Sequence, residues 1–282
     1  PGAFGGAEEA DARVLTAPRP VIERPPEASR MANQRMALRR PVRRPRFRHA
    51  PWSPDVSPSE IFGDHGEGRG SPGSGAGTLG AMRGRYIALE GPEGCGKSSV
   101  ATALAGALDA VLTRETGGTS IGGRIRAILH DPEVTAMNDR AEALLTAADR
   151  AQHLAEVVAP ALRAGRHVVS DRSVYSTLAY QGYGRGLLVS KLREINDWAV
   201  GSVWPDLAVL LDAPAEILEA RMSGRQYDRF ELQSAAFHRR VRDGFRRLAE
   251  DEPDRWIVVD ATSPADEVAA TVRAAVTTRL GI

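Results

Sequence analysis

Apolar and polar residues follow two distinct patterns along most of the chain. From residue 86 onward, short continuous apolar runs are separated by longer segments in which apolar residues recur at helical spacing. The first pattern predicts buried strands and the second predicts amphipathic helices. The expected strands cover 86–90, 110–113, 167–170, 207–211 and 256–259. The expected helices cover 98–108, 121–129, 140–164, 187–200, 214–222, 234–250 and 265–280.

This alternation of strands and helices predicts an α/β fold with one five-stranded parallel sheet. Parallel strands need crossover connections, and continuous apolar runs indicate strands that are covered by helices on both faces. Pro160 lies inside one expected helix and predicts a kink or a break there. Ligands bind such sheets at the carboxyl ends of the strands. The acids Glu90, Asp171, Asp212 and Asp260 are expected at that edge.

The first 85 residues lack this periodicity and differ in composition from the rest. They hold 11 of the 18 prolines and 12 of the 28 glycines. Their 14 arginines and 9 acids give a charge of +5, whereas 21 arginines, 2 lysines and 27 acids give residues 86–282 a charge of −4. A segment this rich in proline and glycine buries too little apolar surface to offset its ordering entropy. We therefore expect residues 1–84 to form a disordered extension and residues 85–282 to form the folded domain.

The role of the extension stays open at this level. Eight arginines and no acid between Arg30 and Arg48 would suit a polyanion. Arginine outnumbers lysine 35 to 2 in the whole chain, however, so the excess is weak evidence and we do not expect nucleic acid to be a partner. Met82 lies four residues before the first expected strand, and a translation start there would remove residues 1–81 from the native protein.

Several classes of protein are excluded by simple counts. The single cysteine, Cys95, cannot form an internal disulfide, which excludes a secreted disulfide scaffold. No apolar run approaches the ~18 residues that a membrane-spanning helix needs. The N-terminal residues lack the layout of a signal peptide. These observations predict a cytoplasmic protein without a membrane partner.

The strongest motif is a phosphate-binding loop at residues 91–98. Its sequence, Gly-Pro-Glu-Gly-Cys-Gly-Lys-Ser, fits G-x-x-x-x-G-K-[ST] and stands between an expected strand and an expected helix. Backbone N–H groups and the helix N-terminus bind phosphate, lysine reaches the terminal phosphates, and serine ligates Mg²⁺. We expect ATP and Mg²⁺ to be bound by Gly91, Pro92, Glu93, Gly94, Cys95, Gly96, Lys97 and Ser98.

Two further observations concern this loop. No Asn-Lys-x-Asp guanine motif is present, which favours a kinase over a switch GTPase. Cys95 stands where a small side chain is needed and is interpreted as a space filler. The alternative is a reactive thiol whose pKa is lowered by the helix N-terminus.

Asp171 and Arg172 follow a buried strand that is expected next to the loop. Phosphoryl transfer between two phosphates depends on positioning and on charge neutralisation more than on a general base. Asp171 is placed to hold Mg²⁺ directly or through water. Arg172 is placed to clamp the acceptor phosphate with two parallel hydrogen bonds. The alternative for this pair is a surface ion pair.

Together with the phosphate loop, three segments resemble bacterial thymidylate kinases. They are Thr-Arg-Glu-Thr-Gly-Gly-Thr at 113–119, Ala-Ala-Asp-Arg at 147–150, and Ser-Asp-Arg-Ser-Val-Tyr-Ser-Thr-Leu-Ala-Tyr-Gln-Gly-Tyr-Gly-Arg-Gly at 170–186. The resemblance covers about residues 85–276. It implies a homodimeric enzyme that phosphorylates dTMP to dTDP with MgATP.

The resemblance also assigns substrate contacts. It implies that Arg150 binds the thymine carbonyl edge, that Thr177 and Gln181 lie near the pyrimidine ring, and that Tyr180 packs against the deoxyribose. A plain core-packing role for Tyr180 stays open. The resemblance further places Glu93 near the acceptor sugar and phosphate, and makes Arg114 a substrate-binding residue.

Residues 221–231 resemble the lid of these kinases. The variable positions of the phosphate loop contain no arginine, and in this family such a loop goes with a lid that supplies arginine to the transferred phosphoryl group. Arg225 is the first candidate for this catalytic role, and Arg229 is the second, as a residue that binds ATP. The alternative is a solvated run of charges.

Three positions depart from the family pattern. Thr146 stands where the family has a phenylalanine that stacks on thymine, Thr116 replaces a proline that fixes a turn, and Ser173 replaces a common aromatic residue. Loss of a stacking face costs about 1–3 kcal/mol in comparable base contacts. Two alternatives therefore stay open: a nucleoside monophosphate kinase with another base preference, or a nucleotide-binding protein without turnover.

Overall fold

Five parallel strands form one sheet in the order β2-β3-β1-β4-β5. The computed structural model describes residues 83–201, 203–224 and 226–282. The strands are β1 (Tyr86–Glu90), β2 (Val111–Arg114), β3 (Val168–Asp171), β4 (Leu207–Asp212) and β5 (Trp256–Asp260). The predicted sheet is confirmed, and every strand begins within one residue of its predicted start. Because β1 is central, the loop that follows it lies between the ends of β3 and β4.

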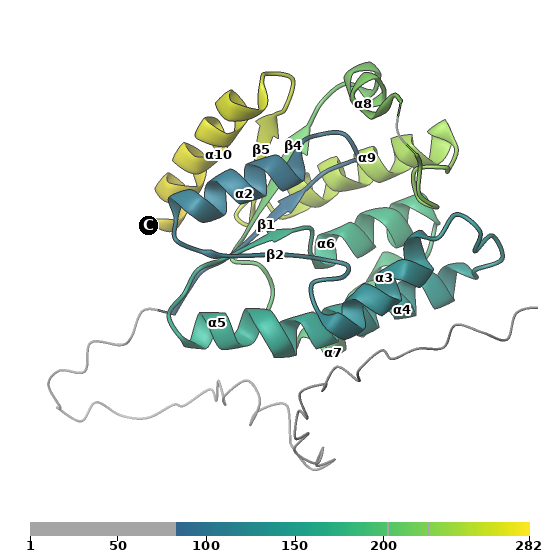
Figure 1. The fold of residues 1–282 in the computed structure, drawn as a ribbon, viewed down its shortest axis with the longest axis horizontal. Helices are drawn as coiled ribbons and strands as arrows, with labels where there is room; N and C mark the ends of the chain where they lie inside the picture. The colour runs from purple at the N-terminus through teal and green to yellow at the C-terminus, as the bar shows by residue number, and fades with distance from the viewer. Residues whose placement is uncertain (1–82, 202, 225) are drawn as a thin grey trace, which may run out of the picture. The chain divides into compact units, whose positions relative to one another are not determined.

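Helices cover both faces of this sheet (Figure 1). On one face lie α2 (Lys97–Ala107) and α10 (Ala265–Leu280). On the other lie α4 (Asp139–His153), α6 (Val174–Thr177), α7 (Val189–Val200) and α9 (Ala235–Asp251), together with the π-helical turns η1 (Leu154–Val158) and η2 (Leu178–Gly184) and α5 (Ala159–Arg163). The remaining helices are α3 (Ser120–His130), which packs on α4, and α8 (Ala215–Met222).

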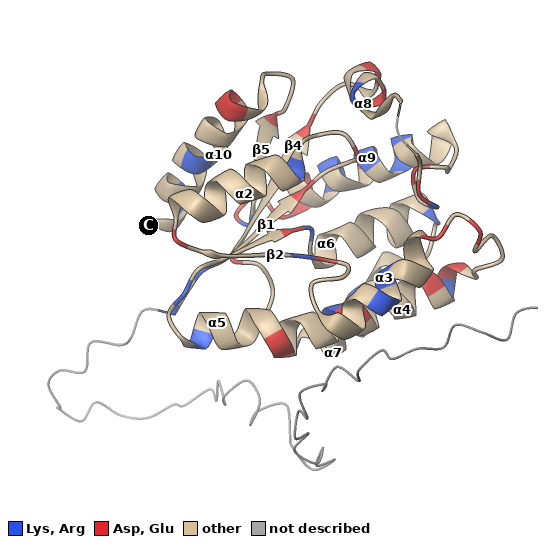
Figure 2. Cartoon of the chain, in the orientation of Figure 1, with Lys and Arg blue, Asp and Glu red and all other residues tan. Residues whose placement is uncertain are grey.

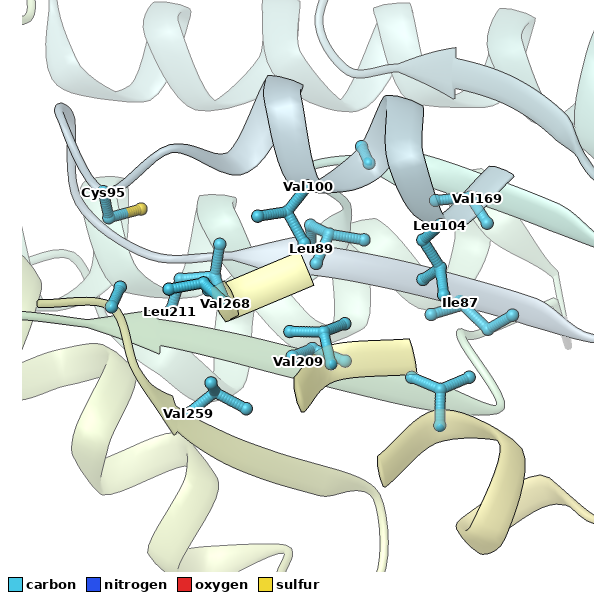
Figure 3. Close-up of a cluster of buried hydrophobic side chains, with 14 of the residues drawn as sticks. Ile87, Leu89, Cys95, Val100, Leu104, Val169, Val209, Leu211, Val259 and Val268 are labelled. Carbon is cyan, nitrogen blue, oxygen red and sulfur yellow. The ribbon is translucent and has the colours of Figure 1, made fainter. Parts of the chain in front are cut away.

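The core follows from the alternation of side chains along each strand. Ile87 and Leu89 of β1 and Val209 of β4 join the apolar cluster beneath α2 and α10 (Figure 3). The intervening Ala208 and Leu210 belong to the cluster on the opposite face, which is closed by α9. Burial of β1 and β4 on both faces explains why their sequences are continuous apolar runs rather than alternating ones.

The expected interruption at Pro160 is present. The helix runs through α4, widens into η1 and continues as α5, and the N–H of Ala159 donates to the carbonyl of Leu154. Proline has no N–H to offer the preceding turn, and a π-helical turn accommodates that gap. The helical segment therefore continues past Pro160 instead of ending there.

One helical segment was missed by the sequence analysis, namely α6 with η2. Gly182 and Gly184 lower its helix propensity, so the local signal is weak. A Cβ atom at Gly184 would lie 2.7 Å from Phe237 of α9. Glycine is present because η2 and α9 approach each other closely.

The predicted extension lies almost wholly outside the described residues, which start at Arg83. Its predicted boundary at residue 84 stays a prediction. Arg83 pairs with Asp206 at the start of the described chain. Among the helices of the described part, none is both long and apolar enough to cross a bilayer.

Candidate active site

The phosphate-binding loop connects β1 to α2 and carries three glycines with positive φ. These are Gly91, Gly94 and Gly96, with φ values of 138°, 80° and 89°. Such angles favour glycine, and a Cβ atom at Gly91 would also lie 2.4 Å from the carbonyl oxygen of Leu211. Lys97 Nζ folds back over the loop and donates to the carbonyl of Pro92 at 2.6 Å. The loop therefore has the backbone geometry and the cation that a phosphate chain needs.

Cys95 packs its side chain beneath this loop, in the core. It is buried and belongs to the apolar cluster that α2 and α10 cover (Figure 3). Its Sγ lies 3.5 Å from Lys97 Nζ. The burial agrees with a space-filling role, and the reactive thiol remains the alternative.

Two side chains that could ligate a metal ion through oxygen, Ser98 and Asp171, lie together at the start of α2. Ser98 Oγ donates to Asp171 Oδ2 at 2.5 Å, because β3 pairs with β1 and places Asp171 opposite Leu89. Within the described ranges no group of three or more His, Cys, Asp or Glu side chains could enclose a metal ion. A hydroxyl and one carboxylate suit Mg²⁺, which usually completes its octahedron with water and substrate phosphates. The donor set therefore fits the predicted ion.

Arg172 links the phosphate loop to the neighbouring cavity. Its φ of 75° lies in the left-handed region, which is rare for residues other than glycine and marks a locally strained position. Nη1 donates to the Gly91 carbonyl and to Ser176 Oγ, each at 3.1 Å. Nη2 donates to Glu93 Oε1 at 3.0 Å and to Tyr180 Oη at 3.1 Å.

Arg172 stays protonated although it is largely removed from solvent. Burial alone would lower the pKa of Arg172, but Tyr180 and Glu93 raise it above its ordinary value. Burial would likewise raise the pKa of Glu93, but Arg172 and Lys97 lower it. Both groups therefore stay ionised. Glu93 Oε2 is buried and has no hydrogen-bond partner in the described part of the chain, which leaves one oxygen for a donor on a ligand.

A cavity opens beside Arg172 and brings together the residues predicted to contact the nucleotide base and sugar, and we call it the acceptor cavity after that prediction. Its lining includes Thr146, Arg150, Thr177, Tyr180 and Gln181. Glu93 and Arg172 line the same cavity. Residues from α4, α6 and η2 thus meet at the phosphate loop, as expected for two substrates that exchange a phosphoryl group.

Arg150 is held rigidly in this cavity. Its Nε donates to Glu115 Oε2 at 2.7 Å, its Nη1 donates to Asn196 Oδ1, and its Nη2 donates to the carbonyl of Ser173 at 3.1 Å. Burial would raise the pKa of Glu115, but Arg150 lowers it, so this buried pair stays charged. His153 Nδ1 lies 3.0 Å from the other oxygen of Glu115. The guanidinium therefore has one fixed orientation.

A family model describing thymidylate kinase matches residues 89–272. The chain belongs to the thymidylate kinase family. The thymidylate kinase of Geotalea uraniireducens is 45% identical over 209 residues, which cover 70% of this chain and 98% of that protein. The thymidylate kinase of Trichlorobacter lovleyi is 46% identical, with 70% and 99% covered. The crystal structure of thymidylate kinase from Ehrlichia chaffeensis superposes with a TM-score of 0.58 at 29% identity, covering 69% of this chain and 99% of that one.

This match confirms the resemblance to thymidylate kinases that the sequence motifs predicted. Thymidylate kinases are ATP-dependent nucleoside monophosphate kinases. The departures from the family pattern lie inside the site. Thr146 Oγ1 donates to the carbonyl of Ala143 at 2.8 Å and accepts from Thr177 Oγ1 at 3.4 Å. Phe230 lines the acceptor cavity and contacts Tyr180 edge to face, at 5.9 Å between ring centroids. The sequence analysis did not name this aromatic residue.

Arg126 is a second residue that the sequence analysis missed. It lines both the acceptor cavity and the cleft at the phosphate loop, where Arg114 and Arg172 also lie. The pKa of Arg126 is lowered by burial and then by the charges of Arg114 and Arg172. Figure 2 shows basic segments at the start of α2, beside α6 and on α3. Three arginines with this mutual repulsion favour binding of an anion.

The lid candidates differ in what the structure describes. Arg225 lies outside the described residues. Arg229 is buried on the acceptor side, where its Nε donates to the Leu129 carbonyl at 2.8 Å and its Nη2 to Glu142 Oε2 at 2.6 Å. In this structure it is therefore not brought to the phosphate loop, and its contact with ATP stays a prediction. Arg221 instead donates to the Ala261 carbonyl at 2.8 Å.

Glu90 forms a buried support behind Arg172. It accepts from Ser173 Oγ and Ser176 Oγ, each at 2.6 Å, and Ser176 in turn accepts from Arg172. Ser173, which departs from the family pattern, also caps α6. Burial raises the pKa of Glu90 to about 7, although the two serine hydrogen bonds act in the opposite direction. Glu90 was expected only as an acid at a strand end.

Replacing Glu90 by Gln is expected to remove a pH dependence of stability. The folded pKa of Glu90 is raised, so its contribution favours folding below pH 4.5 and is lost as the pH rises to about 7. From pH 4.5 to 8 the free energy of unfolding of Glu90→Gln should gain about 3 kcal/mol relative to the wild type. Urea unfolding at several pH values measures this difference. A difference that is constant with pH would contradict the shifted pKa.

Proposed function

We propose that this thymidylate kinase transfers the terminal phosphoryl group of MgATP to dTMP and forms dTDP and ADP through the residues described above. The observation that carries the assignment of roles is the position of Arg172, which contacts the phosphate loop through Gly91 and the acceptor cavity through Glu93 and Tyr180. One cation thus touches both halves of the site. The transferred group would pass beside it.

On the donor side, the backbone of residues 91–98 and Lys97 hold the phosphates of ATP. Ser98 and Asp171 would hold Mg²⁺, which supplies neutralisation of phosphate charge when bound. Lys97 is buried, and its Nζ donates to the Pro92 carbonyl. Lys97 binds phosphate when a phosphate oxygen replaces that carbonyl as the acceptor. In this proposal Arg225 completes the donor side from the lid.

On the acceptor side, Arg172 binds the phosphate of dTMP, assisted by Arg114 and Arg126. The unpaired oxygen of Glu93 accepts from a sugar hydroxyl, and Tyr180 lies against the sugar. Arg150, Thr177 and Gln181 contact the base. The attacking phosphate oxygen is already anionic at neutral pH, so positioning and neutralisation suffice and no general base is assigned.

An acceptor panel tests the proposed substrate. The full chain is incubated with MgATP and with dTMP, dUMP, dCMP, dGMP or dAMP, and ADP release is measured. dTMP is expected to give the highest kcat/KM. Turnover of a purine nucleotide in preference to dTMP would overturn the assignment of the cavity, and absence of turnover with every acceptor would overturn the kinase.

We also propose that two copies pair through α4 and α7. A largely apolar groove there is lined by Leu144, Ala147, Ala148, Ala151, Glu194, Ile195, Trp198 and Ala199. Leu144 and Trp198 are 56% and 87% exposed, so the face is apolar and open to a partner. A self-complementary apolar face on two neighbouring helices suits a twofold homodimer.

Replacing Trp198 by Glu is expected to convert this dimer to a monomer. The substitution would bury one unpaired charge from each copy in the apolar interface, which costs more than the remaining contacts provide. Sedimentation equilibrium of the variant and the wild type measures the mass. A wild-type monomer, or a variant that stays dimeric, would contradict the proposed interface.

Two broader assignments belong to this proposal. Residues 85–282 are the kinase domain and residues 1–84 are an extension that takes no part in catalysis. The enzyme acts in the cytoplasm, in line with its single buried cysteine and with nucleotide substrates that are found there.

A further inference from the structure

Glu142 of α4 lies behind the base end of the acceptor cavity, with its side chain buried. Its Oε1 accepts from Gln181 Nε2 at 2.8 Å and from Arg185 Nε at 3.2 Å. Its Oε2 accepts from Arg185 Nη2 at 3.0 Å and from Arg229 Nη2 at 2.6 Å. Burial would raise the pKa of Glu142, but the hydrogen bonds from Arg185 and Gln181 lower it. The group is therefore ionised and can only accept hydrogen bonds.

This carboxylate determines the orientation of the Gln181 amide. An acceptor that has no proton to donate requires the amide nitrogen of Gln181 to face it. Gln181 is itself buried and lines the cavity, and Oε1 is the acceptor that it can present there because Nε2 faces Glu142. Among the described residues no group donates to this oxygen. The Gln181 oxygen is thus available to accept a hydrogen bond from a ligand in the cavity.

We propose that Glu142, acting through Gln181, selects 2,4-dioxopyrimidine bases against 4-aminopyrimidine bases. The inference rests on the proposed function and goes beyond it, because it assigns the choice of base to a residue outside the cavity. Thymine and uracil carry a hydrogen at N3 that Gln181 Oε1 can accept. Cytosine has a lone pair at N3, and two facing acceptors in a dry cavity leave both groups unsatisfied.

Replacement of Glu142 by Gln should reverse the amide of Gln181. The oxygen of the new side chain would stay at the Oε2 position, where Arg185 Nη2 and Arg229 Nη2 both donate to it, and only the 3.2 Å hydrogen bond from Arg185 Nε would be lost at the Oε1 position. Its NH₂ group would then face Gln181 and would require the Gln181 oxygen to turn toward it. Gln181 would present its own NH₂ group to the cavity, which suits N3 of cytosine and opposes N3–H of thymine.

The test compares kcat/KM of the full chain for dTMP, dUMP and dCMP. In Glu142→Gln the ratio of dTMP to dCMP is expected to fall by about tenfold or more, because a hydrogen bond is lost for one base and gained for the other. The ratio of dTMP to dUMP should stay unchanged, since both bases carry N3–H. A general loosening of the cavity would instead alter both ratios.

A matched control is available on the same helical segment. Gln152 Nε2 donates to Glu156 Oε2 at 2.9 Å in an exposed pair that does not line the cavity. Glu156→Gln makes the same chemical change and should leave both ratios at their wild-type values. Gln181→Met removes the amide, and in this background Glu142→Gln should cause no further change in the ratio of dTMP to dCMP.

The outcomes separate this inference from the proposed function. A wild type that phosphorylates none of the three nucleotides would overturn both. A wild type that prefers dTMP, with an unchanged ratio of dTMP to dCMP in Glu142→Gln, would overturn the inference alone. If Glu142→Gln does not fold, Glu142→Asp keeps the charge for both arginines but withdraws its oxygens from Gln181. A ratio unchanged in that variant would overturn the inference equally.

Discussion

Lys97→Met is expected to lower kcat by about 10²–10³-fold while leaving the fold intact. Lys97 is the only lysine of the phosphate loop, and its ammonium group is already directed along the loop toward the Pro92 carbonyl. Negative charge on the terminal phosphates increases as the phosphoryl group moves, so loss of a preorganised cation removes stabilisation mainly from the transition state. Steady-state kinetics with saturating ATP and dTMP measure the change.

The second lysine of the chain provides the control. Lys191 lies exposed on α7 and pairs with Glu194 at 2.6 Å. Lys191→Met removes the same charge and should leave kcat within about twofold, because surface ion pairs contribute little. A Lys97→Met enzyme with kcat within tenfold of the wild type, and with an unchanged unfolding midpoint, would show that the loop does not hold the reacting phosphates.

Arg172→Gln is expected to lower kcat/KM for dTMP by about 10³-fold, since this guanidinium is assigned to the acceptor phosphate and to the transferred group. The substitution also leaves the buried carboxylate of Glu93 without its 3.0 Å partner. The pKa of Glu93 should therefore rise, since Arg172 is the leading group that lowers it against burial. The pH profile of kcat/KM should gain an acidic limb in the variant.

Arg193 allows a matched comparison for this substitution. It pairs with Glu252 at 2.5 Å and lies over the ring of Trp204. Arg172 likewise pairs with Glu93 at 3.0 Å and lies over the ring of Tyr180. Arg193→Gln tests how much activity is lost when such an arginine is removed away from the phosphate loop. An equal loss of kcat/KM in the two variants would indicate that Arg172 has only a structural role.

Much of the site could be predicted from local sequence because phosphate is bound largely by backbone N–H groups of one short loop. Three glycines with positive φ, a lysine and a serine next to a buried strand already specify a phosphate loop. Parallel pairing of β1 with β3 then brings Asp171 and Arg172 beside that loop. The shared edge follows from parallel strands alone, and the expected position of β3 next to β1 is confirmed by the strand order.

The parts that could not be predicted depend on contacts between distant side chains. Glu142 and Arg229 are 87 positions apart, and nothing local indicates that they form a buried pair. Because the sequence gives no sign of this pair, the resemblance of residues 221–231 to a lid led us to assign Arg229 to ATP binding. Glu90 and Ser176 are 86 positions apart, and nothing in the local sequence indicates their hydrogen bond either. The missed helix, α6 with η2, depends on packing against α9, which overrides the low helix propensity of its glycines.

Direct observation of the products tests the central claim. The full chain is incubated with MgATP and dTMP, and the phosphorus resonances of substrates and products are followed by ³¹P NMR. Formation of dTDP and ADP in equal amounts, with no inorganic phosphate, is the predicted result. Release of inorganic phosphate without dTDP, or persistence of ATP and dTMP, would contradict it.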